Sequence, residues 1–378
     1  MSHSCFYPRL IALILIFLKS GLLFVRAQQP NEWPLIWDNI RLNFECNQKS
    51  DFTVSKENSK FLGFGGLWSP LYFINDTNGE IKYFISEDSC HNKSHQFLKN
   101  SNFSNHEKYK YDWQFESNYY FAILKIAACR IPNAQGKYYI FNQISTDYKI
   151  LDTLKQNMRI VYRVLEDSID NGMGGFRDKG TTYLSNTPLF FQNIVPFNNN
   201  KGYWLIAKGL NKYYVYKIDE NGINIHDSII NNEKFRGYRD CIMSPMGTRL
   251  LSFNLSNNYQ CLFEPNIKNT EITVYDFDKI IGKLSYHKKI DFTLLYKSLS
   301  TANYAFPVSF SFSPNDSLLY VNSYDGRLNA ANRSFISQMY VNDNSRFYFI
   351  DSTGDQDYYT GYIGIVSNSG KLFFTSHA

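Results

Sequence analysis

Imidazole and thiol groups gather in one short stretch of the sequence. Three histidines follow one another there, His91, His95 and His106, and Cys90 directly precedes the first of them. Imidazole and thiolate groups bind soft or borderline metals. The spacing of these residues fits no recognised zinc pattern, however, and a hydrogen-bonded turn explains them without a metal. The sequence therefore predicts no metal site here.

A run of glycines at 172–175 (GMGG) is a second candidate for chemistry. Glycine-rich loops bind phosphate when backbone N–H groups and a helix N-terminus converge on the anion. No helical pattern follows this run, and Lys179 does not lie at the offset that a phosphate loop requires. We interpret the run as a tight β-turn and predict no cofactor.

Neighbouring carboxylates offer the third candidate, as general acid and base. The two pairs are Glu166 with Asp167 and Asp355 with Asp357. Adjacent carboxylates in polar turns are usually solvated, and the sequence does not bring distant acids into one pocket. Neither a Gly-x-Ser-x-Gly nor a His-Glu-x-x-His motif occurs, which removes the two commonest hydrolase signatures. We therefore predict a protein that is not an enzyme.

Two tryptophans, Trp68 and Trp113, are the candidate ligand-binding aromatic residues because they lie beside turn-rich sequence. A planar ring supplies a large apolar area at little cost in conformational entropy, which suits contacts with sugars or proteins. Most of the 29 Tyr and 31 Phe residues must instead pack between sheets. Trp204 lies inside a predicted strand and is a weaker candidate.

Short runs rich in Tyr, Phe, Ile and Val predict the elements that position these side chains. Each run is bounded by Asn, Asp, Gly or Ser, has a length typical of strands, and is enriched in β-branched and aromatic residues. The runs are 81–86, 137–142, 158–164, 203–207, 212–218, 249–254, 271–276, 318–322, 346–350 and 371–375. Long helical periodicity is absent, so the sequence predicts an all-β fold.

One turn repeats along the sequence. Residues 243–251 (MSPMGTRLL) are echoed by residues 312–320 (FSPNDSLLY), and more faintly by residues 366–373. In each copy Pro can pre-set φ, or Gly or Asp can take the unusual dihedral, before a second strand begins. Units of very roughly 50 residues with about four strands predict a β-propeller of about seven four-stranded blades, in a ring that is either closed or incomplete. Two β-sandwiches are the alternative, but they do not require a repeated turn.

Several motifs resemble, in order, the WD40-like propeller of gliding-motility-associated surface proteins of Bacteroidota-type bacteria. They are NGEIKYF at 78–84, HNKSH at 91–95, Ile131-Pro132 with KYYIF at 137–141, DNGMGG at 170–175, GYWLIA at 202–207, VYDFD at 274–278 and the Ser313-Pro314 turn. The resemblance covers roughly residues 60–378 and implies an exported or surface-attached propeller. Members of this family often carry C-terminal sorting domains, and this sequence ends at Ala378 without one. We therefore expect either that residues 32–59 supply a closing strand or that the sequence is a fragment of a longer protein.

Residues 1–27 have the features of an export signal. Arg9 precedes an apolar run at 10–18, and the small side chains of Val25 and Ala27 place cleavage near Ala27. An uncleaved anchor is the alternative, but Lys19 interrupts the apolar stretch well short of the ~20 residues that span a bilayer. We expect a signal peptide at 1–27, a lead-in at 28–59 and a propeller at 60–378, with the protein secreted or on the cell surface.

The chain that remains after cleavage is nearly neutral, because the removed segment carries three basic residues and no acidic one. It gives no electrostatic reason to expect nucleic acid, and no later segment is apolar enough to cross a membrane. Five cysteines remain, an odd number, and an oxidising compartment permits disulfides. Cys241 and Cys261 flank one predicted hairpin and are the first candidates for a disulfide.

Together these patterns predict an exported, non-enzymatic propeller whose loops bind an extracellular or cell-surface protein or glycan. A propeller hydrolase with an acidic site in its central channel is the first alternative. A structural spacer within a longer surface protein is the second.

Overall fold

The structure of the protein is a computed structural model, and it describes most of the strands together with several of the turns that join them. The described residues are 32–37, 40–45, 52–56, 72–76, 81–85, 89–94, 96–101, 126–145, 158–197, 199, 201–230, 241–254, 271–290, 305–325, 334–343, 347–352, 362–366 and 372–375.

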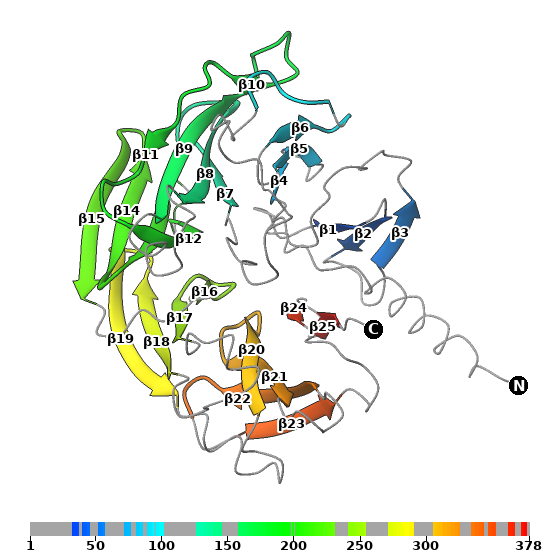
Figure 1. Cartoon of the computed structure of the whole chain (residues 1–378), viewed down its shortest axis with the longest axis vertical. Helices are drawn as coiled ribbons and strands as arrows, with labels where there is room; N and C mark the ends of the chain where they lie inside the picture. Colours follow the sequence, from blue (N-terminus) through cyan, green and yellow to red (C-terminus); the bar gives the residue numbers. More distant parts are fainter. Residues whose placement is uncertain are drawn as a thin grey trace, which may run out of the picture. The chain divides into compact units, whose positions relative to one another are not determined.

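Within these residues every regular element is a β-strand, and almost every strand pairs antiparallel with its neighbour in sequence (Figure 1). Each of the ten predicted runs falls on a strand; the run at 249–254, for example, is β17 (Arg249–Asn254). The all-β prediction is confirmed. Each sheet is a meander, because a chain that returns along the neighbouring strand pairs antiparallel with it.

The chain divides into two compact units, which we call the N-terminal unit (residues 23–233 and 278–284) and the C-terminal unit (residues 1–22, 234–277 and 285–378). The strands of the N-terminal unit are β1 (Glu32–Trp37), β2 (Ile40–Glu45), β3 (Phe52–Lys56), β4 (Tyr72–Asn75), β5 (Ile81–Ile85), β6 (Cys90–Asn92), β7 (Ile126–Arg130), β8 (Lys137–Ser145), β9 (Met158–Glu166), β10 (Gly175–Phe176), β11 (Thr182–Tyr183), β12 (Leu189–Pro196), β13 (Tyr203–Gly209), β14 (Lys212–Asp219) and β15 (Gly222–Ile230).

These strands form sheets of three, three, five and four strands in order along the chain. The strands of the predicted lead-in, β1 to β3, pair with one another, and the predicted domain boundaries stay a prediction. The five-stranded sheet has the order β10-β9-β8-β7, with β11 also paired to β9, and the four-stranded sheet has the order β12-β13-β14-β15.

The five-stranded sheet is buried on both faces, because alternate residues of its strands enter two different cores. Ile140 packs in one apolar cluster with Ile85 of β5 and Leu165 of β9. The next residue, Phe141, packs in a second cluster with Leu205 of β13. Both β8 side chains are almost fully buried. This stacking of neighbouring sheets explains why β8 and β9 are rich in apolar residues without strict alternation.

The C-terminal unit contains two further four-stranded sheets and one hairpin. Its strands are β16 (Cys241–Met243), β17 (Arg249–Asn254), β18 (Glu271–Asp278), β19 (Lys283–Ile290), β20 (Ala305–Phe312), β21 (Leu318–Asp325), β22 (Ser334–Tyr340), β23 (Phe347–Ser352), β24 (Tyr362–Val366) and β25 (Leu372–Thr375). The turn between β18 and β19 belongs to the N-terminal unit.

The repeated turn has the same hydrogen bonds in both clear copies. In the first copy the Ser244 amide donates to the Arg249 carbonyl, and the Arg249 amide donates to Ser244 Oγ. In the second copy Ser313 and Leu318 make the same two bonds. The fourth residue of each turn has positive φ, +68° at Gly247 and +57° at Asp316. The repeated sequence therefore forms a repeated turn structure.

The third, fainter copy corresponds to the hairpin of β24 and β25, which pair antiparallel. Its turn lies outside the described residues. No closed sheet is present in the described part of the chain, so the count of about seven blades and the closure of a ring stay predictions.

Candidate functional site

A cavity of about 430 Å³ lies on the five-stranded sheet of the N-terminal unit. Its lining includes three cationic side chains, Lys137, Arg163 and Arg177, and two carboxylates, Glu166 and Asp178. All of them come from β8, β9 and the segment that runs from β10 towards β11. Because the cations in this lining outnumber the carboxylates, the cavity favours an anionic ligand.

The strand register brings the charged groups of the cavity together. Lys137 is the first residue of β8 and lies directly opposite Glu166, the last residue of β9. On the other side of β9, Gly175 of β10 is also paired with Glu166. Because β10 ends one residue later, Arg177 leaves the sheet beside the same carboxylate. Two cations thus flank one anion as a direct result of strand pairing.

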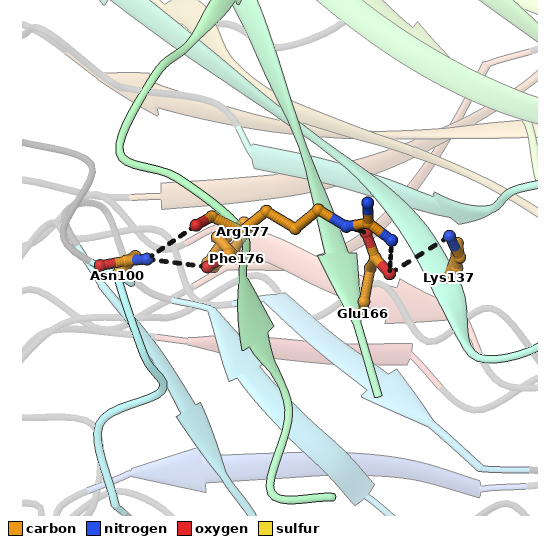
Figure 2. Close-up of polar contacts among 5 residues, drawn as sticks. All are labelled: Asn100, Lys137, Glu166, Phe176 and Arg177. Atoms are coloured by element: carbon orange, nitrogen blue, oxygen red, sulfur yellow. Dashed lines mark hydrogen bonds and ion pairs between the residues drawn. The ribbon is translucent and has the colours of Figure 1, made fainter. Parts of the chain in front are cut away.

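Glu166 is buried, 5% exposed, and both of its carboxylate oxygens are engaged (Figure 2). Arg177 Nε donates to Oε1 over 2.6 Å and Arg177 Nη2 to Oε2 over 3.1 Å. Lys137 Nζ lies 3.2 Å from Oε2. The hydrogen bond from Arg177 above all, with a further one from Lys137, holds the pKa of Glu166 below its usual value. The group is therefore an ionised carboxylate at neutral pH.

Arg163 lies in the lining of the cavity and is 4% exposed. Its guanidinium carbon lies 4.2 Å from the centre of the Phe176 ring, and its Nη2 donates to the Asn100 carbonyl over 2.8 Å and to the Asp178 carbonyl. Burial lowers the pKa of Arg163, but a guanidinium remains charged at neutral pH even so. The side chain is held on several sides and provides a fixed positive charge.

The segment around Asn100 fixes the backbone that carries Arg177. Asn100 has φ of +56°, a conformation that Asn tolerates better than most residues, and its Nδ2 donates to the carbonyls of Phe176 and Arg177 over 2.9 and 3.2 Å (Figure 2). The Phe176 amide donates in turn to the Lys99 carbonyl. Arg177 therefore has a fixed backbone, while its side chain is 71% exposed and can move.

The glycine run is the tight turn that the sequence predicts. Asp170, Asn171, Gly172 and Gly174 all have positive φ, and strand β10 follows the run. A Cβ on Gly174 would lie 2.5 Å from the Tyr83 hydroxyl, so glycine is required there by space as well as by conformation.

The histidine-rich segment is a hydrogen-bonded turn in its described part, as the sequence predicts. Asn92 Oδ1 accepts from the amides of Ser94 and Gln96, each over 3.0 Å. His91 is described, whereas His95 and His106 lie outside the described residues. Among the residues that can be described, no group of three or more His, Cys, Asp or Glu side chains could hold a metal ion.

Glu166 and Asp167 are not the solvated carboxylates that their adjacent positions in the sequence led us to expect. The two carboxylates have separate partners, and Asp167 accepts from the Tyr83 hydroxyl over 2.7 Å and from Lys82 Nζ over 2.5 Å. Burial above all, and then this bond to Asp167, raises the pKa of Tyr83. Of the two, Glu166 alone lines the cavity. Asp355 and Asp357 lie outside the described residues.

The remaining predicted site residues are only partly described. Trp68, Trp113 and Cys261 lie outside the described residues, so the aromatic sites and the disulfide stay predictions. Cys241 is buried on β16. Trp204, the weaker candidate, is 4% exposed on β13 and its Nε1 donates to the Lys279 carbonyl over 2.9 Å, which makes it part of the packing.

Lys137, Arg163 and Arg177 are functional candidates that no motif in the sequence indicates. One signal was available for Arg163, since it is a charged residue in the middle of the apolar run MRIVYRVLE of β9. A charged side chain within a strand buried on both faces must be paired or stacked. For Lys137 and Arg177 the sequence offers no comparable signal, because their proximity arises from register.

The ion pairs of Glu166 predict a pH-dependent contribution to stability. Because the folded pKa lies below the unfolded value of about 4.3, this contribution is complete above that value and is lost as the pH falls through the folded pKa. We expect the difference in free energy of unfolding between the wild type and Glu166→Gln to be larger at about pH 7 than at about pH 3. Urea unfolding followed by circular dichroism at both pH values measures it, and an equal difference at both would contradict the assignment.

Comparison with known proteins gives similarity at the level of solved structures. No family model matches the sequence. No curated protein matches it either.

Within the described residues, no helix is long and apolar enough to span a membrane.

Three solved structures to which the chain is similar include propellers and enzymes. The β-propeller domain of Cps50 (Swd1) from Myceliophteria thermophila is 9% identical with a TM-score of 0.38, covering 86% of each chain. A candidate 6-phosphogluconolactonase from Bacteroides uniformis is 14% identical with a TM-score of 0.34, covering 84% of this chain and 73% of that one. A luciferin-regenerating enzyme is 12% identical with a TM-score of 0.37, and the match covers 82% of this chain and 87% of that one.

These findings correct one prediction and leave another open. The prediction that the protein is not an enzyme is contradicted, because two of the similar structures bear the names of enzymes. It rested on missing motifs, and a motif reports only catalytic residues that are close in sequence, not residues that strand pairing brings together. None of the three similarities links the chain to gliding-motility proteins, so that resemblance stays a prediction.

Proposed function

We propose that the protein is an exported β-propeller hydrolase that acts on a small anionic ester in the cavity beside β9. One observation carries the proposal: an ionised, buried carboxylate, Glu166, is paired with Lys137 and Arg177 in the lining of a cavity that Arg163 also lines. Cations bind the carboxylate or phosphate of a substrate, and a carboxylate can remove a proton from water.

In the free protein Arg177 and Lys137 restrain Glu166, because a carboxylate paired with two cations is a weak base. An anionic substrate competes with Glu166 for these cations. Arg177 is the partner that exchanges, since its side chain is mostly exposed, whereas Arg163 is buried and fixed. Binding of the substrate anion to Arg177 raises the pKa of the released carboxylate and makes it a stronger base.

The reaction then follows from the positions of the groups. Glu166 takes a proton from a water molecule as the water oxygen forms a bond to the ester carbon or phosphorus. The bond to the alkoxy group breaks, and the leaving alkoxide receives the proton from Glu166. The carboxylate returns to its ionised form, and no cofactor is needed.

Glu166→Gln tests this role, because the variant keeps the shape of the side chain and removes the base. Chromogenic p-nitrophenyl phosphate, a p-nitrophenyl ester bearing a carboxylate, and a neutral p-nitrophenyl ester are the substrates. We expect kcat on an anionic substrate to fall by at least about 100-fold, since general bases contribute that much, with KM little changed. Arg177→Ala is expected chiefly to raise KM.

The matched control is Asp219→Asn. Asp219 is also an acid with a pKa below its usual value, chiefly because of the hydrogen bond from Lys217, but it is absent from the cavity lining. We expect this variant to retain the wild-type rate. The proposal would be rejected if the wild type hydrolysed neither anionic substrate, or if Glu166→Gln kept the full rate on them.

Two features support the propeller architecture and the export. Antiparallel four-stranded sheets follow one another along the chain, and the turn at Ser244 is repeated at Ser313 with the same hydrogen bonds. Residues 1–27 have the charge and apolar pattern of a signal peptide, although they lie outside the described residues. N-terminal sequencing of the exported protein would test the cleavage site, and the expected first residue is Gln28.

A further inference from the structure

A serine and a histidine lie in contact at the start of β6, separate from the residues that line the cavity. Ser89 Oγ lies 3.0 Å from His91 Nε2, and both residues are 6% exposed. A serine hydroxyl bonded to an imidazole nitrogen is the arrangement that activates serine as a nucleophile, because the imidazole accepts the proton as the oxygen attacks. Neither residue lines the cavity, so the chemistry of this pair is independent of the proposed function.

The backbone holds this pair on both sides. Residues two apart on a strand point to the same face, which places the side chains of Ser89 and His91 together. On one side β6 pairs with β5, with His91 opposite Phe84. On the other side the Leu98 amide donates to the Cys90 carbonyl over 2.9 Å, and His91 is bridged to Phe97. The backbone of His91 is therefore held on both sides, and Ser89 directly precedes the strand that carries it.

One aromatic side chain lies against the imidazole. The Phe97 ring has its centre 4.2 Å from that of His91, tilted by 44°, and Phe97 is itself 73% exposed. At this distance the ring covers part of the imidazole. Rotation of this side chain about its own bonds uncovers the imidazole without breaking the backbone pairing on either side of β6, and such rotations are fast for exposed residues.

We propose that Ser89 is a nucleophile activated by His91, that Phe97 covers the imidazole, and that the substrates of Ser89 are small neutral esters. Ser89 Oγ attacks the ester carbonyl, and its proton passes to His91 Nε2. The bond from the carbonyl carbon to the alcohol oxygen breaks, and the alcohol leaves with the proton from His91. Water then attacks the acyl-Ser89 ester, gives its proton to His91 and releases the acid, with the proton returned to Ser89.

The test uses the full chain and a fluorophosphonate probe. Ser89 Oγ forms a bond to phosphorus, the P–F bond breaks, and fluoride leaves as His91 takes up the proton of the hydroxyl. We expect one equivalent of label in the intact mass, and peptide mapping to locate it on Ser89. The heat-unfolded chain is expected to stay unlabelled, since activation depends on the folded geometry.

Variants separate the roles of the three residues. Ser89→Ala is expected to lose the label, and His91→Gln to react at least about 100-fold more slowly, in line with the loss of a general base. Phe97→Ala is expected to react faster, because the cover is removed. Ser94→Ala is the matched control: Ser94 belongs to the same turn, but its contact in that turn is the bond from its amide to Asn92 Oδ1.

The labelling of the wild type decides the proposal even if a variant does not fold. Label on any residue other than Ser89, or none on the folded wild type, would overturn it. An undiminished labelling rate in folded His91→Gln would overturn the role of the histidine. A labelling rate in Phe97→Ala that is slower than that of the wild type would overturn the role of Phe97 as a cover. Labelling of Ser89 is measured separately from the hydrolysis of anionic esters, so failure here and failure of the cavity site are told apart.

Discussion

Replacing Asp316 by alanine is expected to lower the free energy of unfolding of the C-terminal unit by about 3–5 kcal/mol. Asp316 is 4% exposed and accepts three hydrogen bonds from the preceding copy of the repeated turn. The donors are Ser244 Oγ over 2.5 Å, the Met246 amide over 3.2 Å and Thr248 Oγ1 over 2.6 Å. The substitution leaves all three without this acceptor. Ser244 is buried, and a buried donor left unsatisfied costs about 1–3 kcal/mol, with smaller costs at the two part-buried donors.

Asp316→Asn is the matched control, because it keeps an acceptor oxygen and a side chain that tolerates the φ of +57°. We expect it to cost less than half as much as alanine. Since the chain has two units, hydrogen exchange at β16, β17, β20 and β21 should accompany thermal unfolding, so that the loss is assigned to the right unit. A loss below about 1 kcal/mol in Asp316→Ala would show that the turns do not depend on this carboxylate.

Replacing Gly202 by alanine is expected to destabilise the N-terminal unit by about 3 kcal/mol. Gly202 precedes β13, and its carbonyl accepts from the Phe197 amide across the turn from β12. A Cβ at this position would lie 2.5 Å from the Ile218 carbonyl oxygen and even closer to the Phe197 ring. The ring can move, but the carbonyl belongs to the backbone of β14, so relief requires a shift of the strand.

Gly222→Ala is the control that separates crowding from backbone conformation. Gly222 lies at the turn from β14 to β15, has φ of +101°, and a Cβ there would meet nothing within 4 Å. We expect a loss of about 1–2 kcal/mol from the positive φ alone. Urea unfolding of both variants, with hydrogen exchange at β13 and β14, provides the comparison. If Gly202→Ala were no worse than Gly222→Ala, the predicted clash would be wrong.

Local patterns predicted the strands and the turns well, for a physical reason. Strand formation in runs such as 249–254 depends on β-branched and aromatic side chains and on bounding turn residues, all of which are local in sequence. The turns at Ser244 and Ser313 close through bonds within six residues, so a repeated sequence produces repeated bonds. The hydrogen-bonded turn of the histidine-rich segment was predicted for the same reason. There the Asn92 side chain accepts hydrogen bonds from the amides two and four residues further along the chain.

The candidate site was not predictable in this way, because its geometry depends on register and on stacking between sheets. Glu166 was noticed beside Asp167, yet the two carboxylates have different partners, and those of Asp167 lie more than 80 residues away. The prediction that the protein is not an enzyme failed at the same point, since it searched for catalytic residues close in sequence.

The amino-acid sequence by itself determined the strands, the repeated turn and the pattern typical of export, because each depends on neighbours along the chain. Only the tertiary structure decided that Lys137 and Arg177 pair with Glu166 in a cavity that Arg163 also lines, and that Phe97 lies against His91. Charged and aromatic side chains have no local preference strong enough to select distant partners. Their partners are chosen when strands align and buried charges must be compensated.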